Sequence, residues 1–330
     1  MIKLAVIYCC NDFIQEIEYE LKNNPKYNVR TLFFKQSLNG RINKFKAKFA
    51  LRKILSWSEI AFFEWGTEPV IIATSMKKKC KYIVRIHRFE IFRDRKKINW
   101  QKIDHIIFVS DYYRELFLQL LANENRSYLA TQTTKIRNII NPKYSFIKNN
   151  GEKTYTLAII GNVDENKRIY ELLFAFAKMK EQLPQLKLLI VGKTKEDYFL
   201  AVTRLIEKLL LQDSVTFLGH INDLLPIYQK TDIVISNSIQ ESFSVVVQEA
   251  RLCGCHTLAH TWGSSTEFLP ESSLFLEPQT LVDKVIEFYQ LPGEIIHKER
   301  QIIAQQARVD NDLKHIITKI NTVIRGVYNN

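Results

Sequence analysis

Ten short runs of β-branched and aromatic residues alternate with longer amphipathic stretches along this 330-residue chain. A parallel strand pair needs a crossover long enough to hold a helix, so the alternation predicts helices between parallel strands. The apolar runs are continuous, which predicts strands buried on both faces. We therefore expect an α/β protein with doubly wound, Rossmann-like parallel sheets. The expected strands are residues 3–9, 29–34, 60–63, 82–86, 105–109, 155–160, 187–191, 215–217, 232–236 and 256–259.

The hydrophobic pattern lapses at the polar, glycine-containing stretch 147–153. A chain of this length can hold two domains with separate cores, so we place the boundary there, with one domain at 1–150 and the other at 151–330. Two such halves joined by one linker would face each other across a cleft that holds a shared ligand. The last helix, near 310–325, is long enough to pack back on the N-terminal domain.

Positive charge is concentrated in the first half. Residues 1–150 carry 28 Lys and Arg against 13 Asp and Glu, a net +15, while the remainder carries 19 against 22, a net −3. An excess of this size predicts an anionic partner. In the basic run 41–54, Ile42, Phe45 and Phe49 would share a helix face flanked by lysines, which is typical of helices at anionic membrane surfaces. A core helix with a solvated basic face is the alternative for this segment.

Other classes of partner and site are disfavoured. Aromatic residues are not interleaved with the basic runs and no nucleic-acid-binding module is present, so we expect no nucleic acid partner. The five scattered cysteines predict neither a disulfide framework nor a zinc site. No window approaches the roughly 20 apolar residues of a spanning helix, and the N-terminus has the pattern of a strand and not of a signal peptide. We expect a cytoplasmic protein, peripheral at the inner face of the membrane.

Two carboxylates eight residues apart flank a predicted strand–helix junction. Glu241 follows the strand 232–236 and so lies at the carboxyl end of a strand, where open α/β sheets bind their ligands. Glu249 lies on the next helix, 244–253, and its neighbours three and four residues away are apolar. A bare carboxylate on an apolar face is costly, so Glu249 should contact a polar partner or ligand. This pattern indicates a ligand site.

Cations and glycines follow other strands of the same half. Lys167 and Arg168 lie in the first turn of a predicted helix, where a bound anion would relieve their conflict with the helix dipole. Two solvated surface cations are the alternative. Three successive strands end in a glycine, which would let the backbone approach a ligand closely; these are Gly161, Gly192 and Gly219.

The run 155–278 resembles the nucleotide-sugar domain of the retaining GT-B glycosyltransferases of family 4, the glycosyl transferases group 1. The order and spacing of several motifs together carry the resemblance. The first half resembles the family more thinly, in a strand that ends in His87 and in the segments 104–110 and 139–142. The matching residues of the second half are Gly161 with Lys167, Gly192, Gly219, Tyr228 with Asp232, Ser238, Glu241, Phe243, Glu249 with Ala250, Gly254, and Gly263 with Glu267.

The resemblance implies sugar transfer with retention, from a UDP- or GDP-linked donor to a hydroxyl of a glycan or polyprenyl-linked acceptor. Bacterial surface polysaccharide synthesis is the process that it suggests. No aspartate pair separated by one residue stands in a metal-binding context, so we expect a metal-independent hexosyltransferase without a cofactor. A sugar-nucleotide 2-epimerase and a catalytically weak, transferase-like partner subunit are the alternatives.

The resemblance also implies roles for single residues. Glu249 would accept hydrogen bonds from the ribose, and Lys167 would neutralise the diphosphate. Glu241 would hold the donor sugar, and His87 would touch that sugar near the bond that is exchanged. The remaining donor-binding residues that it implies are Gly161, Asn162, Arg168, Gly192, Gly219, Phe243, Ser244 and Val245.

The chain departs from the family pattern at three places. Asn162 stands where members usually have a phosphate-binding arginine, a loss that Arg168 could compensate. Ser244 replaces a glycine that usually follows the phenylalanine. The sequence 9–12 replaces a glycine-rich turn after the first strand, which affects acceptor placement.

Overall fold

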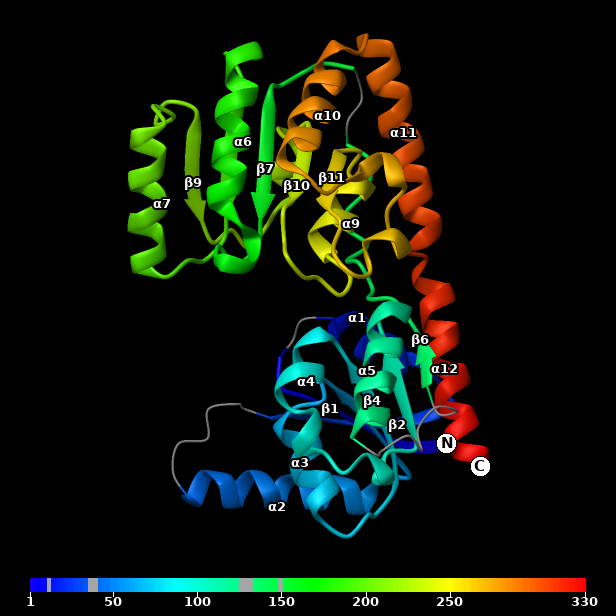
Figure 1. Cartoon of the computed structure of the whole chain (residues 1–330). Coiled ribbons are helices and arrows are strands. Elements are labelled where there is room, and N and C mark those ends of the chain that lie inside the picture. The colour runs from blue at the N-terminus through cyan, green and yellow to red at the C-terminus, as the bar shows by residue number, and fades with distance from the viewer. Residues whose placement is uncertain (11–12, 35–40, 125–132, 148–150) are drawn as a thin grey trace. The chain divides into compact units, whose positions relative to one another are not determined.

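The computed structural model describes residues 1–10, 13–34, 41–124, 133–147 and 151–330 (Figure 1). The chain forms two compact units. The first comprises Met1–Ile139 and Asn311–Asn330, and the second comprises Ile140–Asp310. The stretch 147–153, where we expected the linker, lies partly outside the described residues, as do Asn11 and Asp12 of the loop after the first strand.

The first unit contains a six-stranded parallel sheet in the order β2-β1-β3-β4-β5-β6. Helices connect the strands, and the C-terminal helix α12 completes the unit. The strands are β1 (Ile2–Tyr8), β2 (Tyr27–Phe33), β3 (Ile60–Glu64), β4 (Lys81–Ile86), β5 (His105–Phe108) and β6 (Thr133–Lys135). The α-helices are α1 (Gln15–Asn23), α2 (Arg41–Trp57), α3 (Glu68–Ser75), α4 (Arg88–Arg93), α5 (Asp111–Asn123) and α12 (Leu313–Asn329).

Alternate residues of each strand supply the two faces of this sheet, as the two-residue period of a strand requires. Along β1, Ala5 and Ile7 pack on the face covered by α2, α3 and α5. Leu4 and Val6 pack on the opposite face, which α1 and the apolar stripe of α12 cover. The Tyr27 hydroxyl donates a hydrogen bond of 2.7 Å to Asn321 on α12. The final helix is therefore part of the core of the first unit.

The second unit contains another six-stranded parallel sheet, in the order β12-β11-β10-β7-β8-β9. The strand order reverses direction beside β7, the first strand of the unit. The strands are β7 (Thr156–Ile160), β8 (Lys187–Val191), β9 (Val215–Gly219), β10 (Ile233–Ser236), β11 (His256–His260) and β12 (Leu274–Phe275). The α-helices are α6 (Ile169–Gln182), α7 (Glu196–Lys208), α8 (Leu225–Gln229), α9 (Val245–Leu252), α10 (Pro278–Gln290) and α11 (Gly293–Asp310).

A buried ion pair lies at the amino ends of the strands of the second sheet. Asp232 precedes β10 and accepts a 2.7 Å hydrogen bond from Arg300 of α11. Its other oxygen accepts from the Thr154 backbone and the Tyr289 hydroxyl. These three hydrogen bonds and the positive charge of Arg300 offset the free-energy cost of burying the carboxylate.

The sequence prediction of an α/β protein with two Rossmann-like parallel sheets is confirmed. All ten expected strands are present with small shifts at their ends. Two further edge strands, β6 and β12, were not predicted, because Thr133–Lys135 lacks an apolar run and Leu274–Phe275 is only two residues long. Helix α9 begins and ends within one residue of the predicted helix 244–253.

Candidate functional site

Three loops meet at the carboxyl edge of the second sheet. They follow β7, β10 and β11, which are close neighbours in the strand order. The β7 loop contains the short 3-10 helix Glu165–Lys167, and the β10 loop runs from Asn237 to Ser244. This edge, beside the reversal of strand order, is the place where doubly wound sheets bind ligands.

Asparagine side chains join the β7 loop to the β10 loop. Asn166 donates to the Gln240 carbonyl and accepts from the Gln240 N–H, both at 3.2 Å. The Ile239 N–H donates to the Asn166 carbonyl at 2.8 Å. Asn237 likewise donates to the Arg168 carbonyl at 3.0 Å. The two loops therefore form one hydrogen-bonded unit.

Lys167 and Glu241 form an ion pair across these two loops. Lys167 Nζ lies 2.8 Å from Glu241 Oε1, which also accepts a hydrogen bond from the Ser238 hydroxyl at 2.9 Å. Both charged side chains are largely covered from solvent. The lysine packs over Gly161, where a Cβ atom would come within 3.0 Å of its Cε. Gly161, at φ 129°, thus provides the space that the lysine occupies.

Arg168 makes its contacts at the ends of β10 and β11. The residue adopts a left-handed conformation, with φ 48° and ψ 50°, which is uncommon outside glycine. Its guanidinium donates to Asn237 Oδ1 at 3.1 Å and lies 3.3 Å from His260 Nε2. Burial and this neighbouring cation lower the pKa of His260. The guanidinium is thus engaged within the fold, while Asn162 is exposed at the start of the same loop.

Ser244 also has a left-handed backbone, with φ 52° and ψ 75°, where it begins α9. Glycine adopts this conformation without strain, whereas serine adopts it only at an energetic cost. Phe243 is buried, and its ring packs edge-to-face against Phe268 at 4.9 Å. The Ser264 hydroxyl donates to the carbonyls of Glu241 and Ser242. The third loop is thereby attached to the other two, and Val245 starts the helix at this edge.

Glu249 is a buried carboxylate on α9. Its Oε2 accepts a 2.8 Å hydrogen bond from the Tyr228 hydroxyl, and Tyr144 packs edge-to-face on that tyrosine. Burial raises the pKa of Glu249 to about 7, and the hydrogen bond from Tyr228 opposes this shift. The polar partner expected from the sequence is therefore Tyr228, which was identified there only as a member of a motif.

The glycines at the ends of β8 and β9 differ in their surroundings. Gly192 has φ 147°, and a Cβ there would lie 1.7 Å from the Gly161 carbonyl oxygen. Gly219, at φ 65°, has open space around it. Gly192 is thus required because two strand ends come into close contact there. At Gly219 only the positive φ angle favours glycine, because a side chain would have space.

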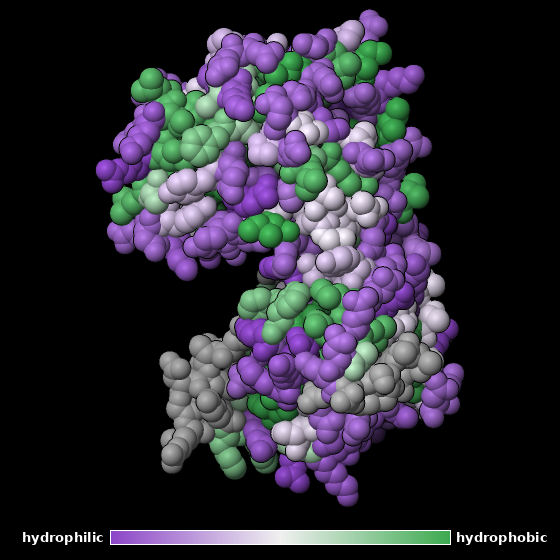
Figure 2. All heavy atoms as spheres, viewed as in Figure 1, coloured by the Kyte–Doolittle hydropathy of each residue, from purple (hydrophilic) through white to green (hydrophobic). Residues whose placement is uncertain are grey.

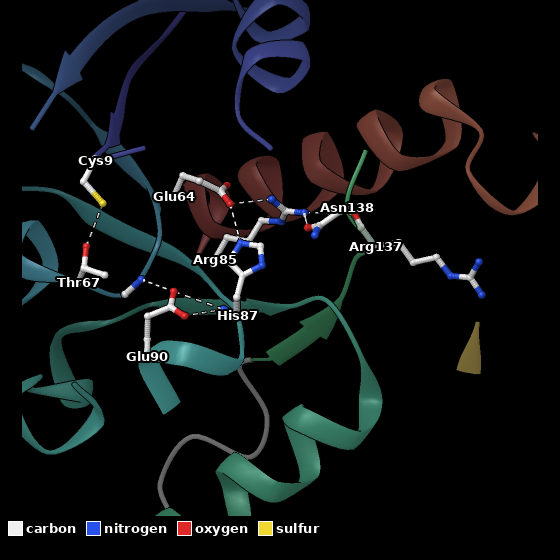
Figure 3. A network of polar contacts seen from close by, with 9 residues as sticks. Cys9, Glu64, Thr67, Arg85, His87, Glu90, Arg137 and Asn138 are labelled. Atoms are coloured by element: carbon white, nitrogen blue, oxygen red, sulfur yellow. Dashed lines mark hydrogen bonds and ion pairs between the residues drawn. The ribbon is translucent and has the colours of Figure 1, made fainter. Parts of the chain in front are cut away.

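His87 lies in the first unit, at the start of α4. Its backbone N–H donates to the buried Glu90 carboxylate, which also accepts from the Gly66 N–H at 3.0 Å. Its ring contacts Glu64, a residue that no sequence pattern had selected (Figure 3). Within the described part of the chain, no group of three or more His, Cys, Asp or Glu side chains is placed to hold a metal ion.

Comparison with protein families identifies the chain. The model of the family "Glycosyl transferases group 1" matches residues 141–310, which is more than half of the chain. The chain belongs to this family. The match covers the second unit, in which Lys167, Glu241 and Glu249 lie.

Two curated relatives of this group 1 glycosyl transferase match parts of it. The Bacillus anthracis N-acetyl-alpha-D-glucosaminyl L-malate synthase is 30% identical over 118 residues, covering 36% of this chain and 30% of that protein. The Streptococcus gordonii GtfA subunit of UDP-N-acetylglucosamine–peptide N-acetylglucosaminyltransferase is 25% identical over 255 residues, covering 73% of this chain and 46% of that protein. The chain therefore spans less than half the length of the curated relatives that it matches.

Solved structures share the fold at lower sequence identity. Anabaena Alr3699/HepE in complex with UDP and glucose superposes with a TM-score of 0.79 at 17% identity, covering 99% of this chain and all of that one. The apo form of the lipopolysaccharide outer core galactosyltransferase WaaB gives a TM-score of 0.69 at 15% identity, covering 98% and 99%. These structures establish the GT-B architecture of this chain.

Proposed function

We propose that this chain is a retaining, metal-independent hexosyltransferase of family 4. It transfers a sugar from a nucleoside-diphosphate donor to a hydroxyl of a glycan or lipid-linked acceptor, in bacterial surface polysaccharide synthesis. The observation that carries the proposal is the 2.8 Å contact of Lys167 with Glu241 at the carboxyl edge of the second sheet. The loops on both sides of this contact are hydrogen-bonded to each other, so a cation and a carboxylate are held ready for one ligand.

Each group has a chemical task in this proposal. The ionised Glu249 accepts hydrogen bonds from the ribose hydroxyls. Lys167 moves from Glu241 to the diphosphate, where its charge stabilises the leaving group. Glu241 and the N–H groups of Phe243, Ser244 and Val245 then hold the hydroxyls of the donor sugar. Asn162 supplies no charge, so Lys167 is the principal cation of the phosphate site.

The reaction needs no protein nucleophile. The acceptor hydroxyl oxygen attacks the anomeric carbon from the side of the leaving diphosphate, and the bond between that carbon and the diphosphate oxygen breaks. The departing oxygen takes the proton of the hydroxyl. Configuration is retained because attack and departure occur on the same face. His87 contacts the sugar in this scheme.

The donor in this proposal is UDP-linked and its sugar is an N-acetylhexosamine. The names of both curated relatives include an N-acetylglucosaminyl group, and HepE was solved with UDP and glucose. A panel of UDP- and GDP-linked sugars, screened for the rise in unfolding temperature that a ligand of the native state causes, tests the assignment. We expect the largest rise with UDP-N-acetylglucosamine, and a flat response to every donor contradicts the proposal.

Product analysis separates the enzymatic alternatives. A transferase yields a new glycoside only when an acceptor is present, whereas a 2-epimerase converts the nucleotide sugar without one. A transferase-like partner subunit would show neither reaction. Mass spectrometry of reactions with and without a polyprenyl-linked glycan acceptor distinguishes the three.

We also propose that the first unit binds an anionic membrane surface through α2. Phe45 and Phe49 on this helix are 73% and 64% exposed, and they lie on its outermost stripe. Lys48 and Arg52 flank that stripe and line a pocket of about 250 Å³ together with Lys77 and Lys79. Among the residues that the structure describes, none of these four cations pairs with a carboxylate. Ile42 was predicted to share this helix face, but its side chain is outside the part of the structure that is described.

The composition of this surface favours a bilayer over a folded partner. Exposed aromatic rings between unpaired cations match the interface of an anionic bilayer, in which each cation contributes about 1 kcal/mol. Elsewhere, on the face shown in Figure 2, hydrophilic residues predominate and hydrophobic ones form separate patches. No helix of the described residues is long and apolar enough to cross a membrane.

Vesicle co-sedimentation tests this proposal. We expect binding to vesicles of phosphatidylcholine with phosphatidylglycerol and none to phosphatidylcholine alone. The double variant F45S/F49S should lose this binding. Phe174→Ser removes a comparably exposed phenylalanine from α6 and is the matched control. Equal binding to both vesicle types, or equal loss in the control, contradicts membrane docking by α2.

A further inference from the structure

A fully buried carboxylate holds the ring of His87 (Figure 3). Glu64 ends β3, and Arg85 lies on the neighbouring β4. Glu64 Oε1 accepts from Arg85 Nη1 at 2.7 Å and lies 2.9 Å from His87 Nε2. A carboxylate oxygen only accepts, so Nε2 of the histidine carries the proton at this contact. The neutral ring then has its acceptor lone pair on Nδ1.

The carboxylate has little freedom to leave this position. Arg85 is completely buried. Its second terminal nitrogen, Nη2, donates to the Arg137 carbonyl and to the Asn138 side chain. Rotating Glu64 away would leave that guanidinium without its counter-charge in the core, which is strongly unfavourable. The position of Glu64 is therefore fixed by the fold and not by His87.

Aromatic residues hold the same ring from another direction. Trp65 stacks on His87 with ring centroids 4.2 Å apart, and Phe13 lies 5.2 Å away. Both aromatic residues have positive φ angles, 77° and 70°, that non-glycine residues rarely adopt. Strained backbone of this kind gathers at functional sites. Two strained residues and one carboxylate thus surround a single histidine.

We infer that Glu64 is a positioning residue that fixes the orientation and the tautomer of His87. This inference rests on the proposed function, in which His87 contacts the donor sugar. Glu64 itself touches no substrate and exchanges no proton. By holding Nε2, it keeps the Nδ1 edge of the imidazole in one orientation, so that each donor sugar is contacted with the same geometry.

Kinetics of transfer test the inference with a matched control. Glu64→Ala should lower kcat at least about tenfold, as for other carboxylates that orient a histidine, with little change in KM for the donor. Glu64→Gln keeps an acceptor oxygen and should retain most of the kcat. Asn138→Ala removes another acceptor from Arg85 without touching His87, so it should also retain kcat. Equal losses in the Glu64→Ala and Asn138→Ala variants would show a merely structural network and overturn the inference.

A double-mutant cycle tests whether Glu64 acts through the histidine. In a His87→Ala background, Glu64→Ala should cause no further loss of kcat, because the group that it positions is absent. If the loss is the same factor in both backgrounds, Glu64 acts in some other way and the inference fails.

Nitrogen NMR of the histidine rings gives a readout that is independent of activity. The chain has seven histidines, and a His87→Asn spectrum identifies the signals of this one. We expect Nε2 to be protonated in the wild type and in Glu64→Gln. A ring protonated only at Nδ1 overturns the inference, even if Glu64→Ala does not fold. Failure of the proposed function is a different result: the wild type then turns over no nucleotide sugar, whatever the NMR shows.

Discussion

Lys167 Nζ lies 2.8 Å from Glu241 Oε1, so two residues 74 positions apart in the sequence form one ion pair. The contact exists because Asn166 and Gln240 bond the two loops together beside it. A cation and a carboxylate in this relationship neutralise each other without a ligand. In the proposed reaction, a diphosphate would compete for the lysine and free the carboxylate to accept hydrogen bonds from sugar hydroxyls.

Replacing the lysine should therefore abolish donor use. We expect Lys167→Ala to lower transfer roughly a hundredfold or more, because it removes the principal charge at the leaving group. Lys187→Ala changes an exposed lysine at the start of β8 and is the control. The measurement is kcat/KM for the donor in both variants. Near-normal transfer by Lys167→Ala would refute the assignment of the phosphate site.

The buried Glu249 predicts a pH-dependent stability. Its pKa is raised from 4.5 to about 7 in the folded chain, chiefly by burial, so folding favours the neutral acid. That contribution is fully present below pH 4.5 and is lost as the pH rises through 7. Glu249→Gln, which stays neutral, should become progressively more stable than the wild type over this window. Urea unfolding at pH 4.5 to 8 measures the difference, and exposed Glu271→Gln should show no such trend.

The same titration bears on donor binding. The ionised form of Glu249 is the better acceptor for ribose hydroxyls, so donor affinity should increase as the pH rises from 6 to 8. Tyr228→Phe removes the hydrogen bond that lowers the pKa of Glu249, and should move this increase to higher pH. Calorimetric titration with UDP at several pH values measures it. An affinity that is the same at pH 6 and pH 8 would argue against Glu249 as the ribose acceptor.

The two strand-end glycines should respond differently to alanine. A Cβ at Gly192 meets the Gly161 carbonyl oxygen at 1.7 Å, so Gly192→Ala must displace the backbone beneath Lys167. A Cβ at Gly219 meets nothing within 4 Å, so Gly219→Ala bears only the cost of its positive φ. We expect Gly192→Ala to lose much more stability and donor binding than Gly219→Ala. Thermal unfolding with and without UDP measures both, and similar effects would mean that the loop adapts.

The sequence correctly predicted the strand before Glu241 and the helix that carries Glu249, because local patterns determine these elements. The strand before Glu241 and the apolar helix face around Glu249 are both visible within a window of about twenty residues. The partners of these groups were not visible. Tyr228, Asn166 and Asn237 are joined to the site only by tertiary contacts, over 21, 74 and 69 positions respectively.

The first unit shows the same limit more strongly. Glu64 and Arg85 lie at strand positions, and only the parallel pairing of β3 with β4 brings them together. The sequence analysis assigned no role to either residue, and both side chains are fully buried. The exposed Phe45 and Phe49 were predicted as a helix stripe, but their exposure depends on which face of α2 packs on the sheet. Which charged residues pair, and which face of a helix packs on a sheet, depend on the tertiary structure. They could not be predicted from local patterns in a single sequence.

The buried pair of Asp232 and Arg300 predicts a large loss of stability on removal of one partner. Arg300→Ala leaves the Asp232 carboxylate in the core with only the Thr154 N–H and the Tyr289 hydroxyl as donors. Breaking a buried pair in this way costs about 3–5 kcal/mol. Arg308→Ala removes an exposed arginine from the same helix and should change stability little. Urea unfolding gives both values, and a loss below about 1 kcal/mol in Arg300→Ala would mean that the carboxylate becomes protonated or solvated without the arginine.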